Sequence, residues 1–179
     1  MQYLLQADYY LFSLINHLPH NSFLDTFFAF LSGIGTYGLI WIVIIICLFV
    51  WEEIEDKEGF YALILALVIT YFAVEVLIKN IFKRARPYIN IPNLVEIGTV
   101  SNSYSFISGH ATISFAAAYI LSYHHKRGKW FYYSLALLIS FSRIYLGKHY
   151  PLDVILGMLF GYFIGFFSVK LTSLINQLL

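Results

Sequence analysis

Three short polar motifs interrupt an otherwise apolar chain, and they carry the residue types that phosphate chemistry needs. Guanidinium and ammonium groups bind phosphate oxygens through charge-assisted hydrogen bonds. An imidazole can act as a nucleophile or as a general acid. Together the motifs offer two histidines, one carboxylate and three fixed cations, which predicts a site that holds a phosphate and transfers it to a histidine. The motifs are Lys79-x6-Arg86-Pro87, Ser108-Gly109-His110 and Ser142-Arg143-x5-His149-x3-Asp153.

The first motif places two cations near the end of an apolar segment. Lys79 and Arg86 are two helical turns apart, so they share one face if the helix extends that far. Pro87 disfavours helical geometry at Arg86 and is expected to end the helix there. The alternative is that Lys79 and Arg86 only flank the end of a membrane span, with their charged groups extending to the membrane surface. Glu75 lies one turn before Lys79 and is expected to pair with it, either orienting the amine or only neutralising it.

The second motif, Ser108-Gly109-His110, opens an apolar segment rich in small residues. Ser108 is a good helix N-cap, and Gly109 lets the backbone approach a ligand closely. Free N–H groups at a helix start make an anion site. His110 on the first turn could then give a proton to a leaving oxygen. The alternative is a capped helix start with a histidine at the membrane interface.

The third motif has the most specific spacing. Pro151 suits the first position of a helix, which puts His149 just before that helix and Asp153 in its first turn. From there the carboxylate can reach back to the imidazole, fix its tautomer and make the other ring nitrogen a better nucleophile. Arg143 ends the preceding apolar segment and faces the same loop. A helix cap with flanking charges is the alternative.

Composition indicates a membrane protein. The chain has 179 residues, of which 60% are hydrophobic and only 12% charged, whereas a soluble domain is about 25% charged. The net charge of +1 gives no argument for nucleic-acid binding. Length predicts a single domain over residues 1–179. The lone Cys47 excludes an internal disulfide.

The apolar pattern predicts an all-α integral membrane helical bundle of about five to six transmembrane helices, with an N-terminal interfacial helix at residues 2–17. The first span is interrupted by glycines and is either one tilted helix or a half-helix followed by a span. Residues 88–107 form a connection long enough for a rim or lid. Gly157, Gly161 and Gly165 form a small-residue face for packing within the bundle or between two copies. The five spans are placed at 22–51, 60–82, 109–124, 130–146 and 152–175.

Basic residues predict the orientation in the membrane. In a five-span layout the N-terminus and the motif loops share one side. Cytoplasmic loops carry an excess of Lys and Arg, so the site is expected on the extracytoplasmic or periplasmic face of the cell (inner) membrane. Beyond the motif cations, the site side carries Lys83, Arg84 and Lys148, and the other side carries Lys57, Lys126, Arg127, Lys129 and Lys170.

The three motifs, in this order, resemble the type 2 phosphatidic acid phosphatase superfamily. The resemblance implies that His149 is the nucleophile that becomes phosphohistidine, that Asp153 supports it and that His110 is the acid for the leaving group. Lys79, Arg86, Arg143, Ser108 and the Gly109 amide would hold the phosphoryl oxygens. Ile107 stands where the family usually has proline. Three cations and a helix N-terminus suit phosphoryl transfer without a metal or other cofactor.

The expected function is a metal-independent lipid phosphatase in the membrane. Lipid A 1-phosphate or undecaprenyl diphosphate is the favoured substrate, and phosphatidylglycerophosphate or phosphatidate is the alternative. Because the motifs lie at helix ends, they are expected to recognise the phosphate rather than the lipid tail. The rival from a different class is a non-catalytic membrane protein that only binds anionic lipid. The sequence makes no prediction of oligomeric state.

Overall fold

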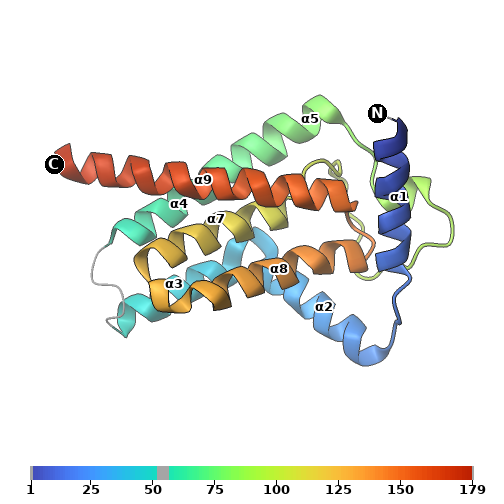
Figure 1. Ribbon diagram of the computed structural model, residues 1–179, viewed down its shortest axis with the longest axis horizontal. Helices are drawn as coiled ribbons and strands as arrows, with labels where there is room; N and C mark the ends of the chain where they lie inside the picture. The colour runs from blue at the N-terminus through green and yellow to red at the C-terminus, as the bar shows by residue number, and fades with distance from the viewer. Residues whose placement is uncertain (1, 52–56, 179) are drawn as a thin grey trace.

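The computed structural model describes residues 2–51 and 57–178, and every regular element in those ranges is helical. Most of the predicted loop at 52–59 therefore lies outside the described residues. The helices lie roughly parallel in a bundle, with one short helix across its end (Figure 1). They are α1 (Gln2–Asn16), α2 (Ser22–Gly35), η1 (Thr36–Gly38), α3 (Leu39–Val50), α4 (Glu58–Thr70), η2 (Tyr71–Ile78), α5 (Lys79–Phe82), α6 (Pro87–Asn90), α7 (Gly109–His124), η3 (Lys126–Gly128), α8 (Lys129–Tyr145) and α9 (Pro151–Leu178).

Three helical stretches in the described part of the chain are long and apolar enough to span a membrane: Ser22–Val50, Glu58–Asn90 and Pro151–Leu178. The other two predicted spans are the helices α7 and α8, which have 16 and 17 residues. A span needs roughly 20 residues. The two shorter helices pack between the longer ones, and the number of spans stays a prediction.

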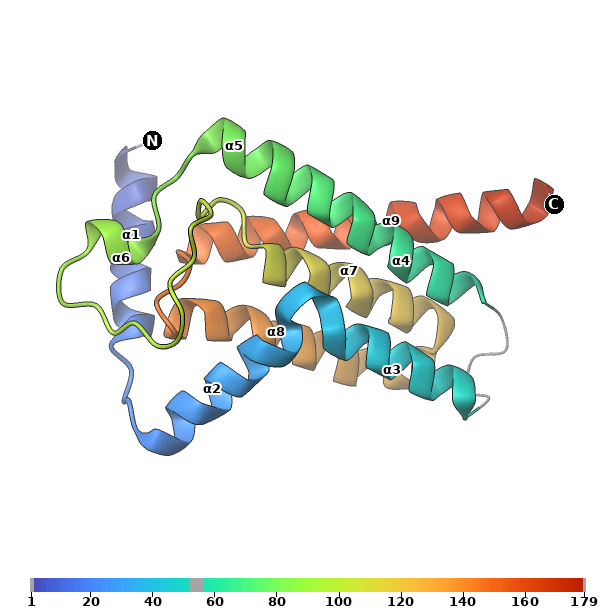
Figure 2. The same ribbon diagram turned by 180° about the vertical axis from the view of Figure 1, so that it is seen from behind.

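The first predicted span is broken into two helices. At the break, Tyr37 and Gly38 have φ angles of 52° and 75°, so α2 ends at Gly35 and α3 starts in a new direction. Figure 2 shows the two helices meeting at an angle. A Cβ on Gly38 would come within 2.7 Å of Leu67 and 2.9 Å of Ile113. The first span is therefore broken and is not one continuous tilted helix; α2 has 14 residues and α3 has 12.

The second predicted span ends at Phe82, the end predicted from the sequence. The helix runs from α4 through η2 and α5 to Phe82, and Lys83 then adopts a left-handed conformation with φ 47°. Pro87 begins α6 instead of ending the preceding helix. The helix therefore does not reach Arg86, so the condition under which Lys79 and Arg86 would share one helical face is not met. A loop brings Arg86 back to Lys79, and the end at Phe82 frees Arg84 to turn toward α1 and α9.

The glycine face of α9 packs inside the bundle against α7. A Cβ on Gly157 would lie 2.8 Å from the Ser108 carbonyl oxygen, and one on Gly165 would lie 2.7 Å from that of Ala116. Gly161 meets the carbonyl of Thr112 still more closely. Packing within the bundle, one of the two predicted roles of this face, is confirmed. The close contact fixes Ser108 at the start of α7 against the start of α9.

The helix α1 lies across the end of the bundle that carries the motif loops (Figure 1). Its Phe12 packs edge to face on the buried Tyr150 at the start of α9. The side-chain amide of Asn16 donates to the Val95 carbonyl at 2.7 Å and accepts from the Val95 N–H at 2.9 Å. The crosswise position agrees with the predicted interfacial helix. It also anchors the 88–107 connection over the end of the bundle.

Candidate active site

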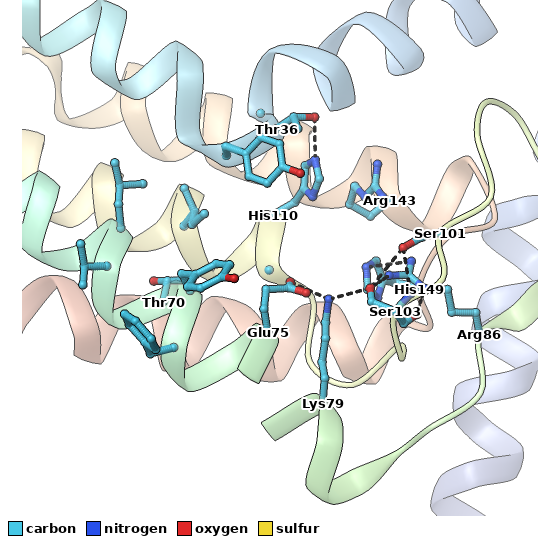
Figure 3. A pocket seen from close by; sticks show the side chains of 18 residues that line it. Thr36, Thr70, Glu75, Lys79, Arg86, Ser101, Ser103, His110, Arg143 and His149 are labelled. Carbon is cyan, nitrogen blue, oxygen red and sulfur yellow. Dashed lines mark hydrogen bonds and ion pairs between the residues drawn. The ribbon is translucent and has the colours of Figure 1, made fainter. Parts of the chain in front are cut away.

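The three motifs converge on one cavity of about 700 Å³. Figure 3 shows Lys79, Arg86, His110, Arg143 and His149 around it, although they come from three separate segments of the chain. Gly109 and Glu75 also line the cavity. The remaining two predicted residues, Ser108 and Asp153, are fully buried and are not among the lining residues. Asp153 lies behind His149.

His149 is held in a tight loop between α8 and α9. The backbone N–H groups of Lys148 and His149 both donate to the Arg143 carbonyl, at 2.9 and 3.1 Å. Gly147 makes the turn possible with a φ of 75°. The His149 side chain is only 2% exposed, and its Nε2 lies 3.4 Å from the guanidinium of Arg86. The loop therefore points one imidazole nitrogen toward the cations of the cavity.

Burial and nearby cations keep His149 neutral. Loss of solvation, together with the positive charges of Arg86, Arg143 and Lys79, holds the pKa of His149 well below its usual value of 6.5. The Arg86 guanidinium can only donate a hydrogen bond, so Nε2 faces it with a lone pair. A neutral imidazole with its lone pair in the cavity is in the form that a nucleophile needs.

Asp153 supports His149 less directly than the sequence predicts. The distance from Asp153 Oδ2 to His149 Nδ1 is 3.8 Å, too long for a hydrogen bond. Ser105 lies between them: its Oγ donates to Oδ2 at 2.5 Å and is 3.4 Å from Nδ1. The same carboxylate oxygen accepts the Tyr150 N–H at 3.1 Å, which caps the start of α9 and holds the carboxylate back from the ring. The expected direct contact is thus replaced by a bridge through Ser105.

Sequence reasoning missed both Ser105 and Arg84. Arg84 counted only as a loop charge, yet it donates to Asp153 Oδ1 at 2.5 Å and to Asp8 Oδ2 at 2.5 Å. The usable signal was Asp8 itself, an acid in the mostly apolar stretch 2–17, because a buried carboxylate requires a cationic partner. For Ser105 the sequence offers only its position three residues before Ser108.

Lys79 and Arg86 are bound to the 88–107 connection. Lys79 Nζ donates to Glu75 Oε1 at 2.6 Å, confirming that predicted pair, and to Ser103 Oγ at 3.3 Å. Arg86 donates to the carbonyl and the hydroxyl of Ser103, at 2.7 and 3.0 Å. Both cations are only 4% exposed. Ser103 thus holds the two charged groups together at the cavity wall.

Two buried polar atoms near the cavity have no hydrogen-bond partner among the described residues: Arg143 Nε and Ser108 Oγ. Ser108 occupies the N-cap position of α7, but its side chain makes no capping hydrogen bond, contrary to the prediction. Its backbone N–H donates to the Asp153 carbonyl at 3.0 Å. Unsatisfied buried donors are uncommon and costly. Of the two residues, Arg143 lines the cavity, whereas Ser108 lies behind its wall next to Gly109.

His110 is oriented by the broken first span. Its Nε2 donates to the Ser32 carbonyl at 3.2 Å and lies 3.3 Å from Thr36 Oγ1. The Ser32 hydroxyl in turn accepts a hydrogen bond from Arg143. The end of α2 and the η1 turn therefore position both His110 and Arg143. Figure 3 shows Thr36 and His110 close together.

A protein-family model, the PAP2 superfamily, matches residues 59–176, which cover all three motifs. This chain belongs to the PAP2 superfamily. The resemblance predicted from the motifs is confirmed, and the protein is an enzyme of the lipid phosphatase class. The rival prediction of a non-catalytic lipid-binding protein is wrong.

Alignments with individual relatives cover more of the chain than residues 59–176, which the family model matches. The chain is 30% identical to a lipid A 4'-phosphatase of Porphyromonas gingivalis over 95% of this chain and 75% of that protein. It is 33% identical to an undecaprenyl-diphosphatase of Sulfolobus acidocaldarius over 91% of this chain and 77% of that protein.

Two solved structures share the fold. Aquifex aeolicus LpxE superposes with a TM-score of 0.77 at 33% identity, covering 89% of this chain and 93% of that one. A transmembrane PAP2-type phosphatidylglycerolphosphate phosphatase from Bacillus subtilis gives 0.75 at 22% identity, covering 97% and 88%. The membrane bundle predicted from sequence is therefore confirmed as a PAP2 membrane fold.

Proposed function

We propose that this protein removes a phosphate from a lipid headgroup through a phosphohistidine at His149, without a metal ion. The observation that carries the proposal is the position of His149 Nε2, facing the cavity 3.4 Å from Arg86. Lys79 and Arg143 line the same cavity. Three cations can neutralise charge on the equatorial oxygens of a transferring phosphoryl group.

The chemistry proceeds in two displacements. His149 Nε2 forms a bond to phosphorus while the bond from phosphorus to the lipid oxygen breaks, and that oxygen takes a proton from His110. His110 then accepts a proton from a water molecule, whose oxygen attacks the phosphohistidine. The N–P bond breaks, its electron pair returns to Nε2, and inorganic phosphate leaves. Arg86, Lys79, Arg143, the Ser108 hydroxyl and the Gly109 amide hold the phosphoryl oxygens during both steps.

The shape of the cavity supports a lipid substrate. Beyond the cations it continues between η1 and the α4–η2 helix, where apolar side chains line it. A headgroup at His149 would leave its tail on this apolar wall. The named relatives include a lipid A 4'-phosphatase and an undecaprenyl-diphosphatase. Lipid A and undecaprenyl diphosphate therefore remain the favoured substrates, although the lipid A relative is named for the 4'-phosphate and the sequence favoured the 1-phosphate. The apolar lining residues include Tyr37, Leu67, Val68, Phe72 and Ile113.

The test is phosphate release from purified lipids in one detergent. The panel is lipid A 1-phosphate, undecaprenyl diphosphate, phosphatidylglycerophosphate and phosphatidate. We expect turnover of at least one lipid by the wild-type protein, unchanged by excess chelator, and none by His149→Gln. His17→Gln is the matched control, because His17 is an exposed histidine in the turn just after α1. Normal activity of His149→Gln, or a chelator loss restored by added magnesium, would contradict the proposal.

A further inference from the structure

Arg84 forms a partly buried bridge between α1 and Asp153, the residue behind His149. Its two terminal nitrogens bind different carboxylates, Asp153 Oδ1 and Asp8 Oδ2, each at 2.5 Å. The guanidinium also stacks on the Tyr150 ring, 4.0 Å from its centroid. Arg84 is 17% exposed and does not line the catalytic cavity. It therefore contacts the carboxylate behind His149 without contacting the position of the phosphate.

Asp8 connects α1 to the same point in a second way. Its other oxygen, Oδ1, accepts the N–H of Leu152 at 2.7 Å, one of the free donors in the first turn of α9. The carboxylate is 4% exposed. Asp8 thus holds both the cation that binds Asp153 and the helix turn that carries Asp153. Asp8 lies outside residues 59–176, the part of the chain that the family model matches.

These contacts leave Asp153 with one orientation. Arg84 occupies Oδ1, so Oδ2 is directed to the hydroxyl of Ser105. A serine that donates to a carboxylate has lone pairs left to accept the Nδ1–H of His149, 3.4 Å away. That acceptor selects the tautomer with the lone pair on Nε2, which is the nucleophilic form.

We infer that Arg84, held in place by Asp8 of α1, is a positioning residue that orients Asp153 and Ser105 behind the nucleophile His149. The helix α1 is then part of the catalytic apparatus and not only a membrane-surface element. The inference rests on the proposed function for its kinetic test. Unlike the residues that line the cavity, Arg84 and Asp8 do not contact the phosphate, so their loss lowers kcat and leaves the affinity for the phosphate unchanged.

The kinetic test compares Arg84→Gln, Arg84→Lys and Asp8→Asn on whichever lipid of the panel turns over fastest. A displacement of about 1 Å can cost about a hundredfold in rate, so kcat of Arg84→Gln should fall about 10- to 100-fold. KM and the inhibition constant of inorganic phosphate should stay within about twofold. Arg84→Lys, which keeps the charge, should recover part of the loss. Lys83→Gln, the exposed neighbour, is the control with wild-type kinetics.

A double variant tests whether Asp8 acts through Arg84. If it does, Asp8→Asn combined with Arg84→Gln should be no slower than Arg84→Gln alone. Additive losses would show that Asp8 acts independently and would overturn that part of the inference. Unchanged kcat in Arg84→Gln would overturn the whole of it. A matching rise in KM and in the phosphate inhibition constant would instead assign Arg84 to phosphate binding.

A spectroscopic readout separates this inference from the proposed function. The ¹⁵N resonances of His149 in the resting protein report which ring nitrogen carries the proton. We expect Nδ1–H in the wild type and a mixture of tautomers in Arg84→Gln and Asp8→Asn. If no lipid of the panel were hydrolysed, the proposed function would be contradicted. The change in the His149 tautomer would still test the inference about Arg84, because it does not require turnover. An unchanged His149 spectrum in both variants would overturn it.

Discussion

At the scale of single residues, the Ser105 hydroxyl lies between the His149 imidazole and the Asp153 carboxylate, whose Nδ1 and Oδ2 atoms are 3.8 Å apart. We predict that Ser105→Ala lowers kcat about tenfold or more, because a misplaced catalytic group is costly in rate. KM should change little, since Ser105 does not line the cavity. The measurement is steady-state kinetics, with Ser122→Ala as the control because the Ser122 hydroxyl donates to the Ala118 carbonyl within α7. Wild-type kcat in Ser105→Ala would show that Asp153 reaches His149 without the serine.

The charge state of His149 predicts a pH dependence. Burial and three neighbouring cations depress the pKa of His149 below 6.5, so the ring stays neutral until the pH falls through that lower value. The acid limb of kcat/KM should therefore lie below pH 6.5, because kcat/KM reports the free enzyme. The substrate phosphate also ionises in this range, so its pKa is measured by ³¹P NMR and its contribution to the pH profile is removed. An acid limb above 6.5 after that subtraction would contradict the prediction.

The lowered pKa of His149 also makes the stability of the folded protein depend on pH. A histidine with a depressed folded-state pKa favours the folded protein fully above its unfolded value of about 6.5. That contribution is lost as the pH falls below 6.5 and through the folded-state pKa. His149 therefore opposes folding only in acid, where charging it would bury a cation beside Arg86.

At the scale of elements, the contact between α7 and α9 holds two motifs in register. Gly161 packs directly on the Thr112 backbone, so a side chain there would force the helices apart. We predict that Gly161→Leu costs about 1–3 kcal/mol or more by overpacking, and that it lowers activity by moving Ser108 away from Asp153. Thermal inactivation in detergent measures the loss.

Gly33→Ala is the matched control for the helix contact. Nothing lies within 4 Å of a Cβ placed on Gly33, which is within α2. Alanine is favoured over glycine in a helix by about 0.5–1 kcal/mol, so this variant should be as stable as wild type or slightly more stable. Equal stability of Gly161→Leu and wild type would mean that the helices can separate without cost.

At the scale of the whole molecule, the α8–α9 loop that carries His149 and the η3 turn between α7 and α8 lie at opposite ends of the bundle (Figure 1). The five-to-three distribution of basic residues predicts that Lys126 faces the cytoplasm and the site faces outward. In a Cys47→Ala background, an impermeant thiol reagent should label Val100→Cys but not Lys126→Cys on intact cells. Both residues are exposed, so both should react after permeabilisation. The reverse pattern on intact cells would invert the topology.

The sequence by itself determined which residues could bind and transfer a phosphate. His149, His110, Arg143, Lys79 and Arg86 all line one cavity. The helices predicted from the sequence carry Lys79, His110 and Arg143, whereas Arg86 and His149 reach the cavity from loops. The apolar segments likewise predicted the membrane bundle, since length and hydropathy are local properties of the chain.

Only the tertiary structure decided how those residues are held. The left-handed turn at Lys83 lets Arg84 reach Asp8 and Asp153, and the loop after it returns Arg86 to the cavity; these are contacts between segments far apart in the chain, which no local pattern records. The bridge from Asp8 through Arg84 to Asp153 spans 145 positions, from residue 8 to residue 153. A buried carboxylate requires a cation, but only the packing of α1 across the bundle selected which cation it would be.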